Sequence, residues 1–152
     1  MTIAPRRPPL QVRGLDDAAE AVRQAGGRLT EPRKAVVQAL LAAGAPVSAD
    51  QIADGLDGRL PRIDPASVYR NLEWLEQIGL VRHVHLGHGP GLYALASQPE
   101  PEYLVCESCG RITSIASTEL DRARHEIERA AGYRAHFDHF PIHGLCGDCA
   151  EP

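Results

Sequence analysis

The chain has 152 residues, a hydrophobic fraction of 43% and a formal net charge of -4 at pH 7. No apolar run approaches the roughly 20 residues that span a bilayer, so we expect no membrane helix. The start, with Arg6 and Arg7 among prolines, is followed by no apolar stretch and does not resemble a secretory signal. We therefore expect a cytoplasmic protein.

The charge is divided unevenly along the chain. Residues 1–97 carry 11 basic and 10 acidic side chains, whereas residues 98–152 carry 5 and 10. The first part is therefore the better partner for a polyanion. All 4 cysteines lie in the second part, so the charge balance and the cysteine content change at the same place in the chain.

Residues 15–96 carry the signals of a helical domain that ends in a β-hairpin, after a Pro- and Arg-rich flexible arm over 1–14. Ser48-Ala-Asp-Gln51 fits a capping box, and Asp64-Pro65 opens another helix. Caps and stop residues predict helices over 16–25, 30–43, 48–56 and 64–78, and strands over 80–86 and 92–95. This order is typical of a winged-helix domain.

The helix that opens at Asp64 is the candidate DNA-reading helix. Its apolar residues recur at steps of three and four, which leaves the other side polar. A helix tip that enters the major groove needs short residues and hydrogen-bond donors, and basic residues near the second helix could contact phosphates. The expected DNA-binding residues are Arg28, Arg33, Ser67, Tyr69, Arg70 and Asn71. An ordinary solvated helix is the alternative, but the hairpin, the helix spacing and the charge split favour DNA.

Residues 97–102 are interpreted as a hinge, because their prolines block regular structure and their charges favour solvent. Residues 103–152 then predict a small α/β domain. Its expected elements are strands over 103–105, 111–115 and 133–142 and a helix over 118–131 that Gly132 ends. The whole chain is expected to have an α+β fold.

Two C-x-x-C pairs, Cys106 with Cys109 and Cys146 with Cys149, are the strongest chemical signal in the sequence. Four thiolates at tetrahedral angles suit Zn²⁺, and the 36 residues between the pairs allow a strand, a helix and a returning strand. Disulfides or a redox-active pair are the alternatives, and a reducing cytoplasm disfavours disulfides. Four protein ligands leave no open position for water, so this zinc would stabilise the fold.

Four phrases in this order resemble the ferric uptake regulator (Fur) family: Arg28-Leu-Thr-Glu-Pro-Arg33, Ser67-Val-Tyr-Arg70, Gly79-Leu-Val81 and Leu104-Val-Cys-Glu-Ser-Cys-Gly110. The resemblance covers almost the whole chain. It implies a winged-helix DNA-binding domain followed by a dimerisation domain with a four-cysteine zinc site. It also implies a homodimeric repressor of metal-uptake or metal-homeostasis genes, which binds double-stranded operator DNA and depends on a regulatory metal ion.

The resemblance also exposes a departure at the junction of the two domains. Positions that usually supply ligands to a sensing site match Pro46, Ala94, Pro101 and Tyr103. None of these replaces an imidazole, so the usual sensing site is expected to be absent. A second family site matches an all-carboxylate set, Glu100, Glu102, Asp121 and Asp138, which favours harder ions such as Mn²⁺ or Fe²⁺. A solvated acidic surface is the alternative reading of that set.

The wing carries histidines that the usual sensing site does not explain. His83 and His85 are two residues apart on a predicted strand, so their imidazoles leave the same face and can share an ion. Residues 79–89 resemble the wing of the nickel-uptake regulators, in which a histidine of the final strand, here His139, completes the site. Ni²⁺ is therefore the favoured regulatory ion, although Zn²⁺, Co²⁺ and Cu²⁺ also accept nitrogen ligands. Alternatively, these histidines and His88 contact DNA phosphates when protonated.

Other functions stay open. A zinc-, iron- or manganese-responsive regulator would have the same fold, and a peroxide sensor would oxidise metal-ligating histidines. A zinc-ribbon adaptor would use the cysteines to bind protein instead of DNA. An enzyme is least favoured, because the sequence contains no Ser-His-Asp order, phosphate-binding loop or zinc-hydrolase motif.

Overall fold

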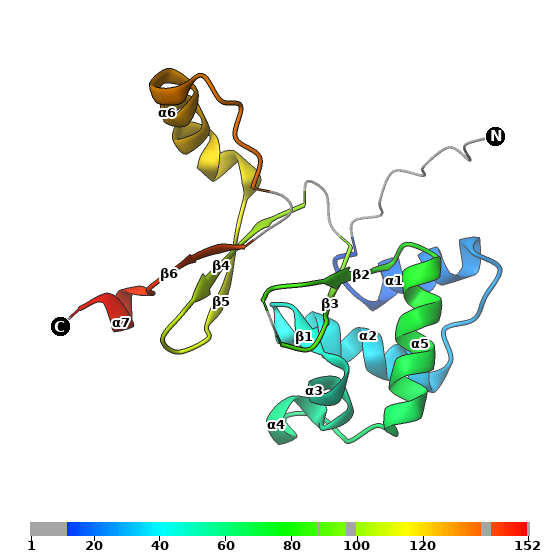
Figure 1. Cartoon of the computed structure of the whole chain (residues 1–152). Helices are drawn as coiled ribbons and strands as arrows, with labels where there is room; N and C mark the ends of the chain where they lie inside the picture. Colours follow the sequence, from blue (N-terminus) through cyan, green and yellow to red (C-terminus); the bar gives the residue numbers. More distant parts are fainter. Residues whose placement is uncertain (1–11, 88, 97–99, 138–140, 152) are drawn as a thin grey trace.

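The computed structural model describes residues 12–87, 89–96, 100–137 and 141–151, and it has the predicted α+β fold (Figure 1). Helices and a small sheet make up the part before Ala96, and a second sheet with one long helix begins at Glu102. Most of the predicted arm and residues 97–99 of the predicted hinge lie outside the described residues. No helix among the described residues is long and apolar enough to cross a membrane.

The N-terminal helices begin at the residues that local chemistry favours. Ser48 and Gln51 form the predicted capping box: each side chain accepts a hydrogen bond from the other's backbone nitrogen, at 3.1 and 2.9 Å. The Asp64 carboxylate accepts a hydrogen bond from the Ser67 nitrogen at 3.0 Å and caps α5. The elements are α1 (Leu15–Gln24), α2 (Glu31–Ala43), β1 (Val47–Ser48), α3 (Ala49–Ala53), α4 (Gly55–Gly58), α5 (Pro65–Gln77), β2 (Val81–Val84) and β3 (Leu92–Leu95).

Two helix boundaries were predicted wrongly. The first helix has Gly14, not Asp16, as its N-cap. The third helix, predicted to residue 56, ends at Ala53. Leu56 and Asp57 have positive φ values of 53° and 59°, which break the helical path within α4. These shifts are smaller than one helical turn and leave the predicted order of helices intact.

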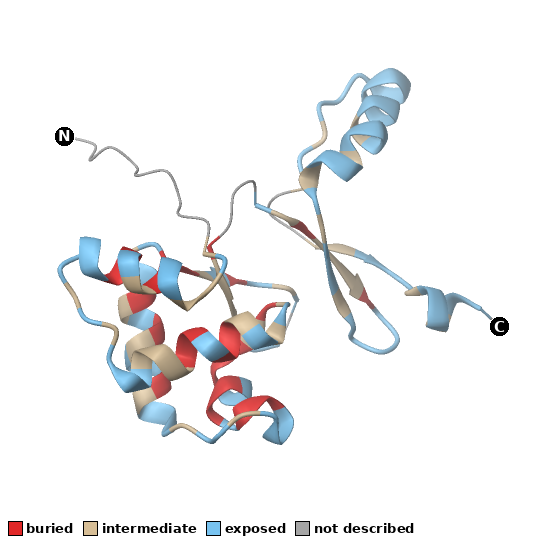
Figure 2. Ribbon diagram, turned by 180° about the vertical axis from the view of Figure 1, so that it is seen from behind, coloured by how far each residue is buried: buried red, intermediate tan, exposed pale blue. Residues whose placement is uncertain are grey.

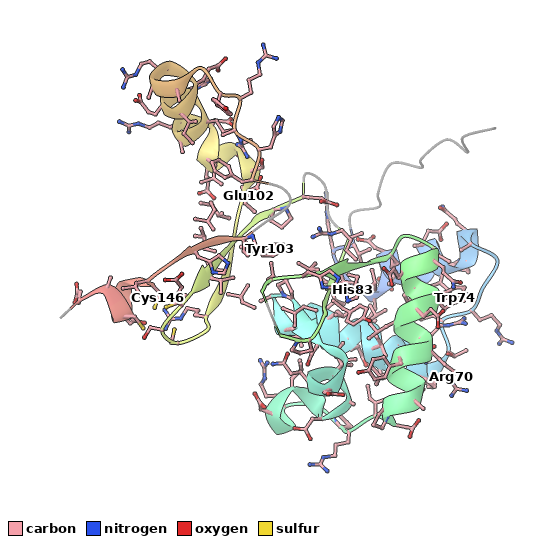
Figure 3. All side chains as sticks on the ribbon, in the orientation of Figure 1. Arg70, Trp74, His83, Glu102, Tyr103 and Cys146 are labelled. Atoms are coloured by element: carbon pink, nitrogen blue, oxygen red, sulfur yellow. The ribbon has the colours of Figure 1, made fainter. Side chains whose placement is uncertain are left out.

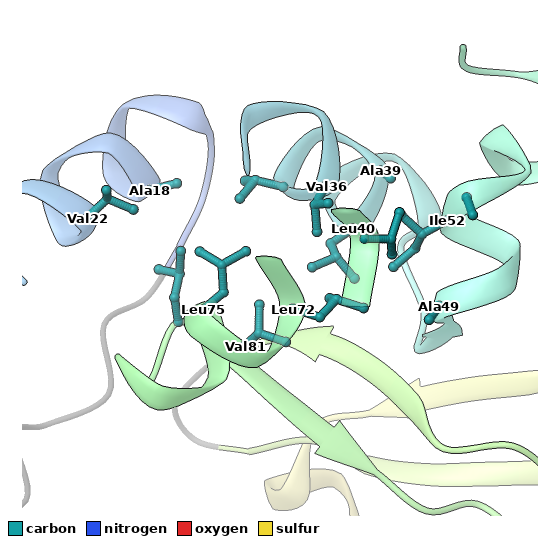
Figure 4. Packing of buried hydrophobic residues seen from close by; sticks show 14 of the residues in the cluster. Ala18, Val22, Val36, Ala39, Leu40, Ala49, Ile52, Leu72, Leu75 and Val81 are labelled. Carbon is teal, nitrogen blue, oxygen red and sulfur yellow. The ribbon is translucent and has the colours of Figure 1, made fainter. Parts of the chain in front are cut away.

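Strands β1, β3 and β2 form an antiparallel sheet in that order, and β2 with β3 is the predicted wing hairpin. β2 ends at Val84 rather than at residue 86, and His83 stands opposite Tyr93 in the register. A buried apolar cluster joins helices α1 to α5 to β2 (Figure 4). It fixes α5 through Leu72 and Leu75 and leaves the polar side of that helix exposed.

The C-terminal sheet has the order β5-β4-β6, with β4 antiparallel to β5 and parallel to β6. Its elements are β4 (Glu102–Cys106), β5 (Ile112–Ile115), the 3₁₀ turn η1 (Ser117–Leu120), α6 (Asp121–Ala131), β6 (Ile142–Gly144) and α7 (Gly147–Ala150). The strand predicted over 133–142 was wrong in most of its described part: residues 133–137 form no strand. A strand parallel to β4 requires the chain to cross back after α6, so β6 begins only at Ile142.

Burial differs sharply between the two parts of the chain (Figure 2). The apolar cluster lies entirely in the helical part, whereas Glu102 and Cys106 are the only buried residues described between 100 and 151. Large side chains there face solvent, with Tyr133 72% and Leu145 56% exposed. So small an interior needs a metal ion, fixed charges or a partner surface to stay folded.

Candidate metal centres and DNA interface

The four cysteines come together at one end of the C-terminal sheet (Figure 3). Cys106 ends β4 and Cys109 lies in the following turn, while the second pair flanks the start of α7. The pairing of β6 with β4 brings the two loops side by side. All four Sγ atoms lie within 4.8 Å of one another, and the described residues hold no other such group of His, Cys, Asp and Glu side chains. This donor set fits a tetrahedral zinc site with no position left for water.

The backbone favours ionisation of the first thiol. Amide groups of Cys109 and Cys146 donate hydrogen bonds to the Cys106 sulfur and lower the pKa of this thiol to about 6. The Ser108 hydroxyl lowers the pKa of Cys149, but the thiols of Cys146 and Cys109 outweigh it and raise that pKa to about 11. Sulfur atoms this close do not all ionise without a cation between them, and a divalent metal ion brings that charge.

Contacts outside the sulfur atoms hold the two cysteine loops together. The guanidinium of Arg111 donates a hydrogen bond to the Asp148 carboxylate at 2.6 Å, and this bond raises the pKa of Arg111. The Glu107 nitrogen donates to the Gly144 carbonyl at 2.8 Å. These contacts do not involve the cysteine side chains, so they help to hold the two loops in position around the four sulfur atoms.

The three described residues of the set expected to form a second metal site, Glu100, Glu102 and Asp121, do not form one compact group. Glu100 pairs with Arg82 at 3.3 Å, whereas Glu102 and Asp121 both pair with Arg124, at 2.9 and 3.0 Å. The fourth expected ligand, at position 138, lies outside the described residues. Arginine side chains therefore neutralise the carboxylates that the sequence offered to a hard metal ion.

The positions matched to the usual sensing site do meet at the junction of the two parts. Pro46, Ala94, Pro101 and Tyr103 line one cavity of about 200 Å³. Its walls are mostly apolar, and the Tyr103 hydroxyl accepts a hydrogen bond from Arg82 at 3.0 Å. The described residues thus provide no set of nitrogen ligands where the family resemblance would place one.

The wing histidines lie beside each other, as predicted. The His83 and His85 ring centres are 4.5 Å apart, and the His83 ring stacks on Tyr93 at 4.7 Å. A Cβ atom at Gly91 would overlap the His83 ring, so this glycine makes room for the stack. Both histidines line a cavity of about 470 Å³ with residues of the C-terminal part, Phe137 and Pro141 among them. The predicted third ligand at position 139 and the wing histidine at 88 lie outside the described residues.

The DNA-reading candidates gather along α5 and the start of α2. A surface hollow of about 500 Å³ is lined by four of them, Arg33, Ser67, Arg70 and Asn71. Tyr69, at the same helix tip, is 51% exposed. The Asn71 amide donates to the Ser67 backbone carbonyl at 2.8 Å and to the Ser67 hydroxyl at 3.2 Å, so these two side chains are already positioned within the helix.

Arg33 also has an intramolecular role. Its guanidinium lies 3.7 Å from the centre of the Trp74 ring and donates a hydrogen bond to the Arg28 carbonyl at 2.8 Å. Gly27 lies against the same ring, because a Cβ atom there would come within 2.6 Å of it. This packing joins the start of α2 to α5, and Arg33 and Trp74 line the hollow together with Arg70. Trp74 and Arg70 lie on the same helix, α5 (Figure 3).

Sequence reasoning missed three side chains that organise these sites: Trp74, Arg82 and Arg124. Trp74 lies one helical turn after Arg70, a spacing that is visible in the sequence. Arg82 bonds to Tyr103, 21 residues away, and Arg124 bonds to Glu102, 22 residues away. No local pattern signals such distant pairs.

The model of the ferric uptake regulator family matches residues 24–141, and the chain belongs to this family of transcription regulators. Its relatives include the peroxide operon regulator of Bacillus subtilis (strain 168), which is 27% identical over 137 residues, 90% of this chain and 94% of that protein. The peroxide-responsive repressor PerR of Staphylococcus aureus (strain USA300) is 29% identical over 141 residues, 90% of this chain and 92% of the repressor.

Solved structures share the fold. The Vibrio cholerae ferric uptake regulator has a TM-score of 0.62 and 24% identity over 85% of this chain and 99% of that one. The Pseudomonas aeruginosa regulator, solved with manganese, has a TM-score of 0.60 and 25% identity over 84% and 96%. A zinc uptake regulator solved with zinc and DNA has a TM-score of 0.55 and 25% identity over 88% and 91%.

Replacing Cys106 with Ser should abolish zinc binding and loosen the C-terminal part, because the remaining interior there is too small to hold the sheet. Zinc content and amide hydrogen exchange over residues 100–151 measure both effects. Glu107→Ala, in the same loop but without loss of a thiolate, should leave both unchanged. Full protection of these amides after zinc has been removed with a chelator would contradict this role of the metal.

Proposed function

We propose that this protein is a metal-dependent repressor that binds operator DNA as a homodimer in the cytoplasm and controls metal-uptake or metal-homeostasis genes. We further propose Ni²⁺ as its regulatory ion. The observation that carries the proposal is the adjacent pair of histidines, His83 and His85, whose ring centres are 4.5 Å apart in the cavity where the wing meets the C-terminal part. An ion held there by ligands from both parts would fix the DNA-binding part of the chain relative to the C-terminal part.

The DNA-reading role rests on the hollow between α2 and α5. Arg70 and the Arg33 guanidinium bring positive charge to this surface, and the capped tip of α5 exposes Tyr69 beside them. Arg28, at the entry to α2, is also exposed. A hollow with donors and an aromatic side chain suits phosphate contacts together with base edges in a major groove.

The homodimer is supported by what the C-terminal part leaves uncovered. Tyr133, Leu145 and Ile127 expose large apolar side chains, and the described residues bury only Glu102 and Cys106 between 100 and 151. A second copy would cover this surface. It would also supply the second DNA-binding part that a pseudo-palindromic operator requires.

Two imidazoles are too few ligands to hold a regulatory ion tightly, so we propose His139 as the third. Phe137 and Pro141, the described residues on either side of the segment that contains it, line the same cavity as the wing histidines. Three nitrogen ligands with water favour Ni²⁺ or a similar borderline ion over Mn²⁺.

Arg82 offers a route from that ion to the rest of the molecule. It precedes His83 in β2, and its guanidinium contacts the Tyr103 hydroxyl and the Glu100 carboxylate beyond the junction. A shift of β2 on metal binding would therefore move the anchor between the wing and the C-terminal sheet.

A peroxide sensor is the second candidate, because relatives 27% and 29% identical bear the names peroxide operon regulator and peroxide-responsive repressor. In such a sensor, peroxide would react at a redox-active metal ion and oxidise the histidines that hold this ion. Exposure of the metal-loaded protein to peroxide, followed by mass analysis of the peptides with His83 and His85, separates the two functions. Oxidised histidines together with loss of DNA binding would favour the sensor.

Arg70→Ala should weaken binding to DNA duplexes selected by the wild-type protein by about 1–3 kcal/mol, because a phosphate or base contact is lost. Zinc content should stay unchanged. Arg23→Ala, which removes an exposed arginine of α1, is the matched control and should bind like wild type. Equal affinities of the Arg70 variant and wild type at moderate salt would remove this residue from the reading surface.

Combined replacement of His83 and His85 by Ala should abolish tight nickel binding and the nickel-dependent gain in operator affinity. Calorimetric titration with nickel and DNA binding with and without the ion measure the two effects. His125→Ala, an exposed histidine of α6, should change neither. If both effects persist in the double variant while zinc stays bound, the regulatory site lies elsewhere.

A further inference from the structure

Arg124 occupies an oxygen-lined space between α6, η1 and β4. One guanidinium nitrogen donates to the Ser117 carbonyl at 2.6 Å and to the Asp121 carboxylate at 3.0 Å. The other donates to the Glu102 carboxylate at 2.9 Å and to the Ser117 hydroxyl at 3.0 Å. The Phe137 ring lies 5.3 Å away on one face. The cation thus has a carbonyl, a hydroxyl and two carboxylates around it.

Because Glu102 is buried, its carboxylate depends on the contacts with Arg124. Glu102 is only 6% exposed, and together with Cys106 it makes up the whole described interior of the C-terminal part. An ionised carboxylate removed from water is stable only with a cation and hydrogen bonds beside it. Arg124 provides both through a planar group that bonds in several directions at once.

We propose that Arg124 is the resident cation of this oxygen-lined space and keeps divalent metal ions out of it. Carboxylate, carbonyl and hydroxyl oxygens are the ligands that Mn²⁺, Mg²⁺ and Ca²⁺ prefer. An ion that bound Glu102 and Asp121 together would have to lie where the guanidinium lies, and two cations at one place repel each other. A single side chain therefore ties α6 to β4 and leaves the chain without an oxygen-ligand metal site there.

Ligand chemistry then separates two kinds of metal ion. Arg124 keeps hard ions out of the oxygen-lined space, whereas the thiolates and imidazoles elsewhere in the chain remain available to softer ions. The exclusion does not depend on which ion regulates DNA binding, so it can be tested without DNA and without the wing histidines.

The experiment uses zinc-loaded full-length protein in which His83 and His85 are both replaced by Ala. Mn²⁺ binding is measured by electron paramagnetic resonance, and thermal unfolding is followed with and without Mn²⁺. This background should bind no Mn²⁺ tightly and show no shift in Tm. Added Arg124→Ala should lower the Tm in the absence of Mn²⁺, create a Mn²⁺ site and restore much of the Tm when the ion is present.

Two further variants make the result specific. Asp121→Asn, added to Arg124→Ala, should remove the new Mn²⁺ site. Arg129→Ala, which removes an exposed arginine of the same helix, should gain no site. If Arg124→Ala does not fold, Arg124→Gln is measured in its place, because it removes the charge but keeps a hydrogen-bond donor.

Either of two outcomes would overturn the proposal. The first is that the background protein binds Mn²⁺ and loses this binding on Glu102→Gln, because the ion would then displace the guanidinium. The second is that the folded Arg124 variant binds no more Mn²⁺ than the background, because the oxygens would then not form a cation site.

Discussion

The small interior of the C-terminal part is the constraint on which the rest of the structure depends. Among the described residues its sheet buries only Glu102 and Cys106, a charged side chain and one small thiol, and no large apolar side chain. In place of an apolar core, four converging sulfur atoms stabilise one end of the sheet and the Glu102–Arg124 pair stabilises the other. A domain built in this way is stable only when its charges are matched, so folding and metal binding are coupled.

Two arginines make contacts in the regions where this chain departs from the ligand pattern of its family. Arg82 bonds to Tyr103 and Glu100 at the junction, and Arg124 bonds to carboxylates within the C-terminal part. Both arginines hold together segments that an ion could otherwise connect. Among the described residues, the wing histidines are the ligands that we propose for a regulatory ion, and Arg82, next to His83 in β2, would connect such an ion to the junction.

The parts of the fold that the sequence predicts are those with short-range causes. Ser48 and Asp64 cap their helices through residues three positions away, and the spacing of the cysteines implies their meeting. The strand predicted over 133–142 failed because β6 depends on a parallel pairing with β4, which no local alternation reveals. Arg82 and Arg124 were missed for the same reason, since each finds a partner more than twenty residues away.

We propose that each chain of a dimer carries one zinc ion in its thiolate site and one nickel ion in its wing site. Native mass spectrometry of the zinc-loaded protein during nickel titration tests this proposal most directly. We expect a dimer that retains its zinc and stops at one added nickel ion per chain. A dimer that binds no nickel, or a nickel-saturated protein that has lost its zinc, would contradict it.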